Sequence, residues 1–171
     1  PGPAACCNVR DIKVRRCVLW NAEPGNALEI GYELRCNEVS DVVFEDCDII
    51  HCEYEGNQSG GVLTIHNADR AKVHNVRYEN IRIEDAQEKL GDVYKRQIVF
   101  RNIDVTGPLF PVSIIRGFEM TNEMHRPRDI RFENVTVQGR TMHSANEMRM
   151  VVELAHELQF EGRVTLEKPE Y

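Results

Sequence analysis

The chain has 171 residues, of which 42% are apolar and 29% charged, a composition typical of one globular domain with a sizeable core. Its formal net charge of −7 disfavours nucleic acid and anionic membranes as partners, because both carry negative charge. No uncharged apolar run approaches the roughly 20 residues that a membrane-spanning helix needs.

The first residues, PGPAACCNVRD, contain no initiator methionine, no basic segment and no apolar core of a signal peptide. We therefore expect a C-terminal fragment of a longer protein. Six cysteines are present, but they form no CxxC pair and no Cys/His cluster with zinc-finger spacing. We expect a monomer with no metal and no organic cofactor, and the even number of cysteines permits disulfides.

Five segments of the chain align without gaps and define a repeat. They are DIKVRRCVLWN (11–21), DVVFEDCDIIH (41–51), NVRYENIRIED (75–85), QIVFRNIDVTG (97–107) and DIRFENVTVQG (129–139). In each segment apolar residues alternate with other residues, a polar pair interrupts the alternation, and the alternation resumes. This pattern predicts a strand, a sharp corner and a second strand that share one apolar face. An amphipathic α-helix is excluded, because the apolar residues do not recur at helical spacing.

The apolar residues of the repeat fall into four columns that are expected to stack from one copy to the next. Column one is Ile12, Val42, Val76, Ile98 and Ile130; column two is Val14, Phe44, Tyr78, Phe100 and Phe132; column three is Cys17, Cys47, Ile81, Ile103 and Val135; column four is Leu19, Ile49, Ile83, Val105 and Val137. In four copies the polar pair ends in Asp or Asn, namely Asp46, Asn80, Asn102 and Asn134. These residue types tolerate the left-handed backbone of a one-residue corner, and their side chains can hydrogen-bond between coils.

A further strand follows in most copies, after a variable polar loop. It is expected in NALEIGY (26–32), GVLTIHN (61–67), PVSIIRG (111–117) and MVVELA (150–155). Each copy then holds about three short strands, and no copy can bury its apolar face alone. The predicted fold is therefore all-β: one right-handed parallel β-helix domain of about five coils over residues 1–171.

The third coil breaks the regular spacing. The interval between Val76 and Ile98 is about ten residues shorter than the other column-one intervals. The deficit falls at EKLGDVYKRQ (88–97), where we expect the third strand to be missing and the coil to be damaged. GDVYKRQ (91–97) matches no column and resembles translated adaptor sequence, with a natural deletion as the alternative. In either case we expect this coil to be the weak point of the stack.

The end of the chain has a weaker column pattern. MVVELAHELQF (150–160) suggests a last strand followed by a short helix. A solenoid end needs a segment that covers its open edge. We therefore interpret 157–171 as a capping segment.

The third strands are expected to form a wall that can bind a linear polymer. If Ile30, Ile65 and Ile115 form one inward row, their outward neighbours include Glu29, Thr64, His66, Ile114 and Arg116. Neighbouring coils are about 4.8 Å apart, so a carboxylate, an imidazole and a guanidinium can come close together. Sugar hydrolysis needs two carboxyl groups, and Arg and His suit carboxylated sugars because both donate hydrogen bonds to oxyanions.

The run NVRDIKVRRCVLWNAEPGNALEIGYE (8–33) resembles a coil of glycoside hydrolase family 28, the polygalacturonases. That coil reads strand, cysteine, Phe or Trp, turn, and then Gly-His-Gly-x-Ser-Ile-Gly, for which GNALEIG (25–31) stands here. GVLTIH (61–66) corresponds to the Gly-Ile-Arg-Ile-Lys segment of the next coil. The resemblance covers the whole chain as a coil pattern, but only a few positions as a motif.

The sequence departs from this family at its site. Asn26 stands where the family has its active-site His, and Glu29 stands where it has Ser. The Arg-x-Lys pair is absent, with only His66 at its Lys end. The resemblance implies that the catalytic aspartates lie one coil upstream of Pro1, outside this chain. From the wall positions and this resemblance together, we expect the substrate-binding residues to be Trp20, Asn26, Glu29, His66 and Arg116.

The sequence supports three hypotheses about function. The first is a glycoside hydrolase acting on pectic or related plant polysaccharide, extracellular or periplasmic (alternatively cytoplasmic), of which this chain is an inactive part. The second is a non-catalytic β-helix that binds polysaccharide or serves as a structural spacer. The third is a polysaccharide lyase, which would need a calcium site of several carboxylates that the sequence does not suggest.

Each candidate residue also has a structural interpretation. Trp20 stacks on a sugar ring or packs at the coil edge; Asn21 orients a substrate hydroxyl or lies in a turn. Glu29 and Glu33 form a working carboxyl pair or are solvated, and Arg116 binds ligand or pairs with a loop carboxylate. Cys17 and Cys47 are expected to pack as buried thiols, with a disulfide as the alternative. The remaining histidines are expected at the surface: His51, His74, His125, His143 and His156.

Overall fold

A computed structural model describes most of the chain. The described residues are 7–22, 26–53, 61–67, 69, 71–87, 91–93, 96–109, 112–120, 123–125, 127–153, 155 and 157–161. Within them the chain forms β-strands and no α-helix. The strands are β1 (Asn8–Arg15), β2 (Val18–Asn21), β3 (Leu28–Ile30), β4 (Glu38–Cys52), β5 (Leu63–Ile65), β6 (Lys72–Ile83), β7 (Gly91–Val93), β8 (Arg96–Val105), β9 (Ser113–Arg116), β10 (Phe118–Met120), β11 (Glu123–His125), β12 (Arg128–Val137), β13 (Arg140–Thr141), β14 (Met150–Glu153) and β15 (Leu158–Glu161).

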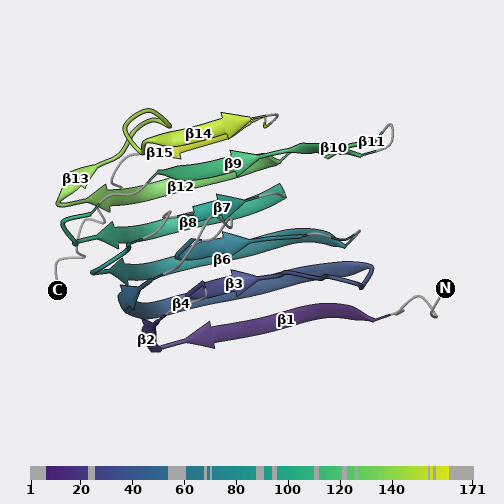
Figure 1. The fold of residues 1–171 in the computed structure, drawn as a ribbon, viewed down its shortest axis with the longest axis horizontal. Helices are drawn as coiled ribbons and strands as arrows, with labels where there is room; N and C mark the ends of the chain where they lie inside the picture. The colour runs from purple at the N-terminus through teal and green to yellow at the C-terminus, as the bar shows by residue number, and fades with distance from the viewer. Residues whose placement is uncertain are drawn as a thin grey trace, which may run out of the picture.

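The strands build a parallel β-solenoid of about four turns (Figure 1). An eight-stranded sheet runs β1-β4-β6-β8-β12-β13, with β2 beside β4 and β15 beside β12. A five-stranded sheet runs β14-β9-β7-β5-β3 and forms the second layer of the stack. The predicted all-β parallel solenoid is confirmed. The sequence predicted about five coils because it has five repeat segments, and five stacked segments enclose four complete turns. The right-handed sense of the solenoid stays a prediction.

The four predicted columns are the registers of the eight-stranded sheet. In column one, Ile12 pairs with Val42, Val42 with Val76, Val76 with Ile98, and Ile98 with Ile130. The last four of these residues are 3% exposed or less, whereas Ile12 is 41% exposed because the first described coil is covered on one side only. Each further coil therefore completes the core of the coil before it.

Column two forms an aromatic ladder through the core. Tyr78 stacks between Phe44 and Phe100, with ring centroids 4.9 and 5.1 Å away. Phe100 in turn stacks on Phe132 at 5.0 Å, and Phe160 of β15 extends the ladder at the same distance. Stacked rings at the spacing of neighbouring strands add to the free energy gained from burial.

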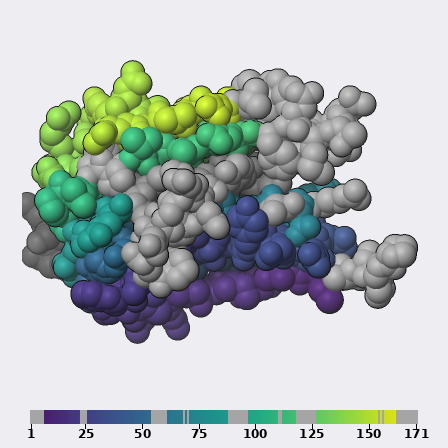
Figure 2. Space-filling model, viewed as in Figure 1, coloured from purple at the N-terminus to yellow at the C-terminus, as the bar shows by residue number. Residues whose placement is uncertain are grey.

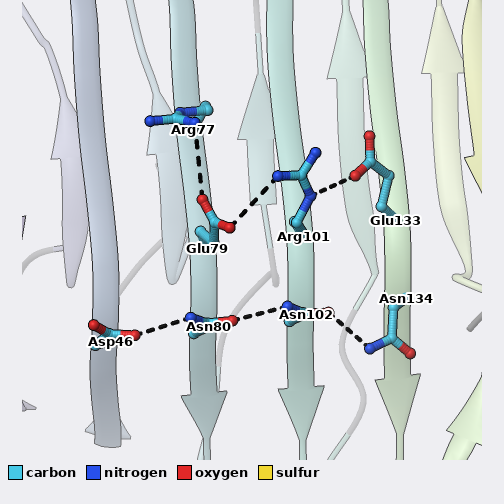
Figure 3. A network of polar contacts seen from close by, with 8 residues as sticks. All are labelled: Asp46, Arg77, Glu79, Asn80, Arg101, Asn102, Glu133 and Asn134. Atoms are coloured by element: carbon cyan, nitrogen blue, oxygen red, sulfur yellow. Dashed lines mark hydrogen bonds and ion pairs between the residues drawn. The ribbon is translucent and has the colours of Figure 1, made fainter. Parts of the chain in front are cut away.

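The corners also form ladders, as predicted. Asn80, Asn102 and Asn134 have φ of 54°, 51° and 52°, and each donates its side-chain amide to the residue one coil earlier at 2.9, 2.8 and 2.8 Å (Figure 3). Beside them an outward row of Arg77, Glu79, Arg101 and Glu133 is joined by ion pairs (Figure 3). Sequence analysis missed a second left-handed corner at the start of each segment, at Asp11, Asp41, Asn75, Gln97, Asp129 and Glu157.

The expectation of a missing strand in coil three is wrong. Gly91–Val93 forms β7, which pairs in parallel with β5 on one side and with β9 on the other. Val93 stands in register with Ile65 and Ile115, so only one residue of this three-residue strand carries the aliphatic pattern of the sheet. The corner ladder spans 22 residues here, against 34 and 32 in the neighbouring coils. The shorter length of coil three is therefore a shortening of the connections between its strands. The five-stranded sheet continues without a break from β5 through β7 to β9.

The end of the stack contains strands and turns but no helix, within the described residues. β14 extends the five-stranded sheet as predicted, and β13 turns back antiparallel on β12. The expected short helix is wrong, because Leu158 and Phe160 of β15 pair with Ile130 and Phe132 and continue columns one and two. Period-two alternation therefore prevails over local helical tendency. Residues 162–171 of the expected cap lie outside the described residues.

The coils follow one another along a single axis. Figure 2 shows them as successive layers, from purple at one end to yellow at the other. Successive coils therefore place residues that are about 30 positions apart in the sequence side by side. Within the described residues the structure contains no helix long and apolar enough to cross a membrane.

Candidate functional site

Glu29 and His66 meet on the outer side of the five-stranded sheet. Glu29 lies on β3 and pairs in register with Thr64 of β5. His66 follows β5 and continues the ladder, because its backbone N–H donates to the Ile30 carbonyl at 2.9 Å. The His66 ring Nδ1 lies 3.0 Å from the Glu29 Oε1. A carboxylate only accepts hydrogen bonds, so the shared proton belongs to Nδ1.

Asn26 completes this cluster. Its side-chain oxygen accepts a hydrogen bond of 2.7 Å from the Gly61 backbone N–H, which ties the start of one coil's third strand to the next coil. The hydrogen bond from His66 lowers the pKa of the Glu29 carboxyl below its ordinary value. Burial opposes this shift, and a hydrogen bond from the Asn26 side chain strengthens it. Glu29 is therefore held as a carboxylate. We call Asn26, Glu29 and His66 the carboxylate–imidazole cluster.

Within the cluster, His66 is buried and Glu29 is partly accessible to solvent. The His66 side chain is 3% exposed, whereas the Glu29 side chain is 27% exposed. The Tyr32 ring meets the edge of the His66 ring at a centroid distance of 5.4 Å. A side chain at Gly31 would have no room, because a Cβ there would lie 2.6 Å from the His66 carbonyl oxygen. His66 thus orients the cluster from beneath, and Glu29 presents its carboxylate to solvent.

This arrangement favours binding over proton donation. An ionised, partly exposed carboxylate accepts hydrogen bonds from hydroxyl groups, which sugars carry in abundance. A lowered pKa makes Glu29 unsuited to be the general acid of a glycosidase, which must stay protonated near neutral pH. Thr64, the register partner of Glu29, is fully buried and donates its hydroxyl hydrogen bond to the Gly61 carbonyl at 2.8 Å. Thr64 shares the face of Glu29, as expected, but its burial leaves it inaccessible to a ligand.

Two of the five predicted binding residues lie elsewhere. Arg116 ends β9, two strands away from His66 across β7. Its Nε pairs with the Glu153 carboxylate of β14 at 2.8 Å, and both side chains are about half exposed. Trp20 lies on β2 of the eight-stranded sheet. The structure therefore brings together three of the predicted residues and places Arg116 and Trp20 in other surroundings.

Trp20 belongs to a second polar cluster that sequence analysis missed. Its indole stacks on the His51 ring at a centroid distance of 4.7 Å and an interplanar angle of 26°. His51 Nδ1 lies 2.9 Å from Asp85 Oδ2, and His51 Nε2 lies 3.2 Å from Glu53 Oε2. We call these four residues the Trp20–His51 cluster. The expectation that His51 is an ordinary surface group is wrong, because only 13% of its side chain is exposed.

The column pattern contained a signal for this cluster. His51 and Asp85 each stand two places after column four, and Trp20 stands one place after it. The one-residue offset is a bulge between Leu19 and Trp20, which restores the pairing of Trp20 with His51. If the alignment is extended past column four, with a gap of one residue between Leu19 and Trp20, then Trp20, His51 and Asp85 fall in one column.

The structure also shows the surroundings of Glu33, Asn21 and the two cysteines Cys17 and Cys47. Glu33 is exposed, and Glu29 contacts His66 and Asn26 instead. Asn21 ends β2 and donates to the Cys52 sulfur at 3.8 Å. Cys17 and Cys47 are free thiols, so the disulfide alternative is wrong, and burial raises the pKa of the Cys47 thiol.

The remaining histidines differ in surroundings. The His74 ring lies 3.5 Å from a Glu38 carboxylate oxygen with a third of its side chain exposed, and His143 is exposed. The His125 side chain and His156 lie outside what the structure describes.

Comparisons with protein-family models, with curated proteins and with solved structures found no match for the chain. Its class is therefore stated from its architecture: a parallel β-solenoid, consistent with a β-helix fold. That fold is compatible with a protein that binds or acts on polysaccharide. Among the described residues no group of three or more His, Cys, Asp or Glu side chains is arranged to hold a metal ion.

Proposed function

We propose that this chain is the polysaccharide-recognition part of a carbohydrate-processing β-solenoid, and that the carboxylate–imidazole cluster contacts the sugar. The observation that carries this proposal is the Glu29–His66 pair at 3.0 Å, with Glu29 ionised and exposed and His66 buried behind it. Such a pair is a fixed acceptor on a rigid wall. It needs no rearrangement to receive a hydroxyl group, so little conformational entropy is lost on binding.

The scaffold suits a linear ligand. The five strands β3, β5, β7, β9 and β14 lie side by side. An extended polysaccharide bound along this sheet therefore contacts each coil in turn. Asn26 fixes the connection between two of these coils through Gly61. Glu29 and its neighbours then contact one sugar unit, and the adjoining coils contact the next.

The second candidate function is hydrolysis of glycosidic bonds by a longer parent protein related to glycoside hydrolase family 28. The specific support is that Asn26, Glu29 and His66, at three positions of the resembling motifs, converge in one cluster. In that reading Glu29 binds substrate, and the general acid and base come from a part of the parent outside this chain. Pectic polysaccharide is the substrate that the resemblance suggests.

Binding and hydrolysis are separated by testing the chain as it is. Calorimetric titration with pectic and neutral oligosaccharides measures binding, and release of reducing ends measures cleavage. We expect binding without cleavage. Glu29→Gln should weaken binding about tenfold or more, because a hydrogen bond to a charged acceptor is lost. Glu33→Gln, an exposed neighbour, is the matched control and should bind as the wild type does.

The outcomes are distinct. Failure of every polysaccharide to bind would contradict the proposal and leave the structural-spacer hypothesis. Equal affinities of Glu29→Gln and the wild type would move binding away from this cluster. Cleavage by the chain alone would show that the acid and base lie within it, contrary to the expectation of upstream aspartates.

A further inference from the structure

The most exposed aromatic side chain described in the structure is held in a fixed orientation. Trp20 is 68% exposed, yet its indole stacks on the His51 ring. His51 in turn is held at both ring nitrogens by Asp85 and Glu53. Three successive coils contribute, because Trp20 lies on β2, His51 on β4 and Asp85 just after β6. The indole is therefore not needed in the core, and its position is fixed from below.

The two carboxylates of this cluster remain accessible. The Glu53 and Asp85 side chains are 37% and 34% exposed. His51 contacts one oxygen of each group, Oε2 of Glu53 and Oδ2 of Asp85, and Gln87 also donates to this Asp85 oxygen at 3.2 Å. The second oxygen of each carboxylate makes no contact with the imidazole. An apolar plate flanked by hydroxyl acceptors is the arrangement that a pyranose ring needs, since its faces are apolar and its rim is hydroxylated.

We propose that Trp20, Glu53 and Asp85 form a binding platform for a neutral sugar unit, and that His51 in its charged form holds this platform together. The proposal rests on polysaccharide recognition as the function, and it narrows the ligand to neutral glycans at a site separate from the carboxylate–imidazole cluster.

Electrostatics selects a neutral ligand. The platform carries two carboxylates and one imidazole, and the chain as a whole has a formal net charge of −7. A uronate placed on Trp20 would meet like charges within a few ångströms, which disfavours binding. A neutral hexose brings only hydroxyl groups, for which the carboxylates are good acceptors.

The protonation state of His51 decides whether the platform is complete. An imidazolium donates from both nitrogens, to Asp85 and to Glu53 at once. A neutral ring has one donor only, so one carboxylate then faces a nitrogen lone pair and the contact is lost. The hydrogen bonds to Glu53 first and to Asp85 second raise the pKa of His51 above its ordinary value. Trp20, Glu53 and Asp85 are the groups that face the ring from the neighbouring elements.

The experiment uses the indole itself as the probe, because the chain has one tryptophan. Neutral hexasaccharides of glucan, mannan, galactan and xylan, and hexagalacturonate, are titrated while the Trp20 fluorescence is recorded. We expect at least one neutral hexasaccharide to shift the Trp20 emission and to protect it from acrylamide quenching. Hexagalacturonate should leave the emission unchanged. The affinity for the neutral ligand should fall as the pH rises through the His51 titration.

Variants separate this site from the first one. Trp20→Ala should weaken calorimetric binding of the neutral ligand about tenfold or more, and His51→Gln should remove the pH dependence. Val18→Ala, an equally exposed position on the same strand, is the control. Binding that neither perturbs Trp20 nor weakens in Trp20→Ala overturns this inference alone. Binding lost in Trp20→Ala but kept in Glu29→Gln supports it, and absence of all glycan binding overturns both proposals.

Discussion

The two sheets of the solenoid use the same parallel pairing for different purposes. In the eight-stranded sheet the four inward columns repeat from coil to coil, as in the aromatic ladder from Phe44 to Phe160. In the five-stranded sheet a single register holds five different residue types: Glu29, Thr64, Asp92, Ile114 and Val151. Repetition marks the columns that stabilise the stack. Unlike neighbours mark the positions that carry the candidate sites, namely the Glu29 register and, in the eight-stranded sheet, the pairing of Trp20 with His51.

The difference has a physical cause. A side chain in a ladder contacts its like on both neighbouring strands, so a residue that suits one position suits them all. A binding site needs unlike groups beside one another, such as the Glu29 carboxylate beside the His66 imidazole. The two requirements exclude each other in one column, and the solenoid assigns them to different columns.

The largest expected effect comes from breaking the repetitive sheet. Phe100→Ala removes a 5% exposed ring that stacks on both Tyr78 and Phe132. We expect a loss of about 3–5 kcal/mol in the free energy of unfolding, because burial and both stacking contacts disappear together. Urea denaturation followed by circular dichroism measures this loss.

The control for this variant is Val18→Ala, at a residue that is 68% exposed. It should change the free energy of unfolding by no more than about 0.5 kcal/mol. Similar values for Phe100→Ala and Val18→Ala would mean that the aromatic ladder does not hold the coils together.

The second effect tests the sheet that carries the site. Gly31→Ala places a Cβ 2.6 Å from the His66 carbonyl oxygen and 3.2 Å from Glu29 Oε1. We expect a loss of about 1–3 kcal/mol in stability, because backbone atoms must move apart. The Glu29–His66 contact should be displaced as well, which is visible as a change in the His66 ring resonances by nuclear magnetic resonance.

Gly139→Ala is the matched control for Gly31→Ala. Gly139 has φ +76°, and a Cβ added there would meet nothing within 4 Å. Its substitution therefore costs about 1 kcal/mol in backbone strain and leaves the site intact. If both variants left the His66 resonances unchanged, the close approach at Gly31 would not be what positions the cluster.

The repetitive sheet was largely predictable from the sequence, since period-two alternation recurs in all five segments and an Asp or Asn corner residue in four of them. All four columns and the left-handed corners at Asp46, Asn80, Asn102 and Asn134 are found as predicted. β7 was not predicted, because only Val93 of its three residues continues the row of Ile65 and Ile115, which is too little pattern to identify a strand.

The site was predictable only in part. Asn26, Glu29 and His66 were found from the motif positions and the inward row of isoleucines. Their roles were not distinguishable, since the burial of His66 and the exposure of Glu29 depend on neighbouring coils. The Trp20–His51 cluster was missed because a bulge shifts its alignment by one residue.

A third, smaller effect tests the corner ladder. Asn102→Ala removes hydrogen bonds to Asn80 and Asn134 and puts alanine at φ 51°. We expect a loss of about 1–2 kcal/mol in stability, at the low end for hydrogen bonds because these amides are exposed. Asn102→Gly keeps the backbone conformation and loses only the hydrogen bonds, so it should be less destabilising than Asn102→Ala. The reverse order in urea denaturation would show that backbone conformation is not what selects Asn here.

The smallest effects distinguish the two clusters by pH. The pKa of Glu29 is lowered on folding, so its contribution to stability is present above the ordinary carboxyl value of 4.5 and is lost as the pH falls through the folded-state value. The pKa of His51 is raised, so its contribution to stability is present below pH 6.5 and is lost as the pH rises through the folded-state value.

Glu29→Gln should therefore flatten the acidic side of the stability profile, and His51→Gln should flatten the side above pH 6.5. Glu33→Gln and His143→Gln, both at exposed positions, are the matched substitutions with which the two variants are compared. If His51→Gln altered only the acidic side, the ring would be neutral in the folded protein, and the Trp20 platform would have to be held by something other than the two carboxylates.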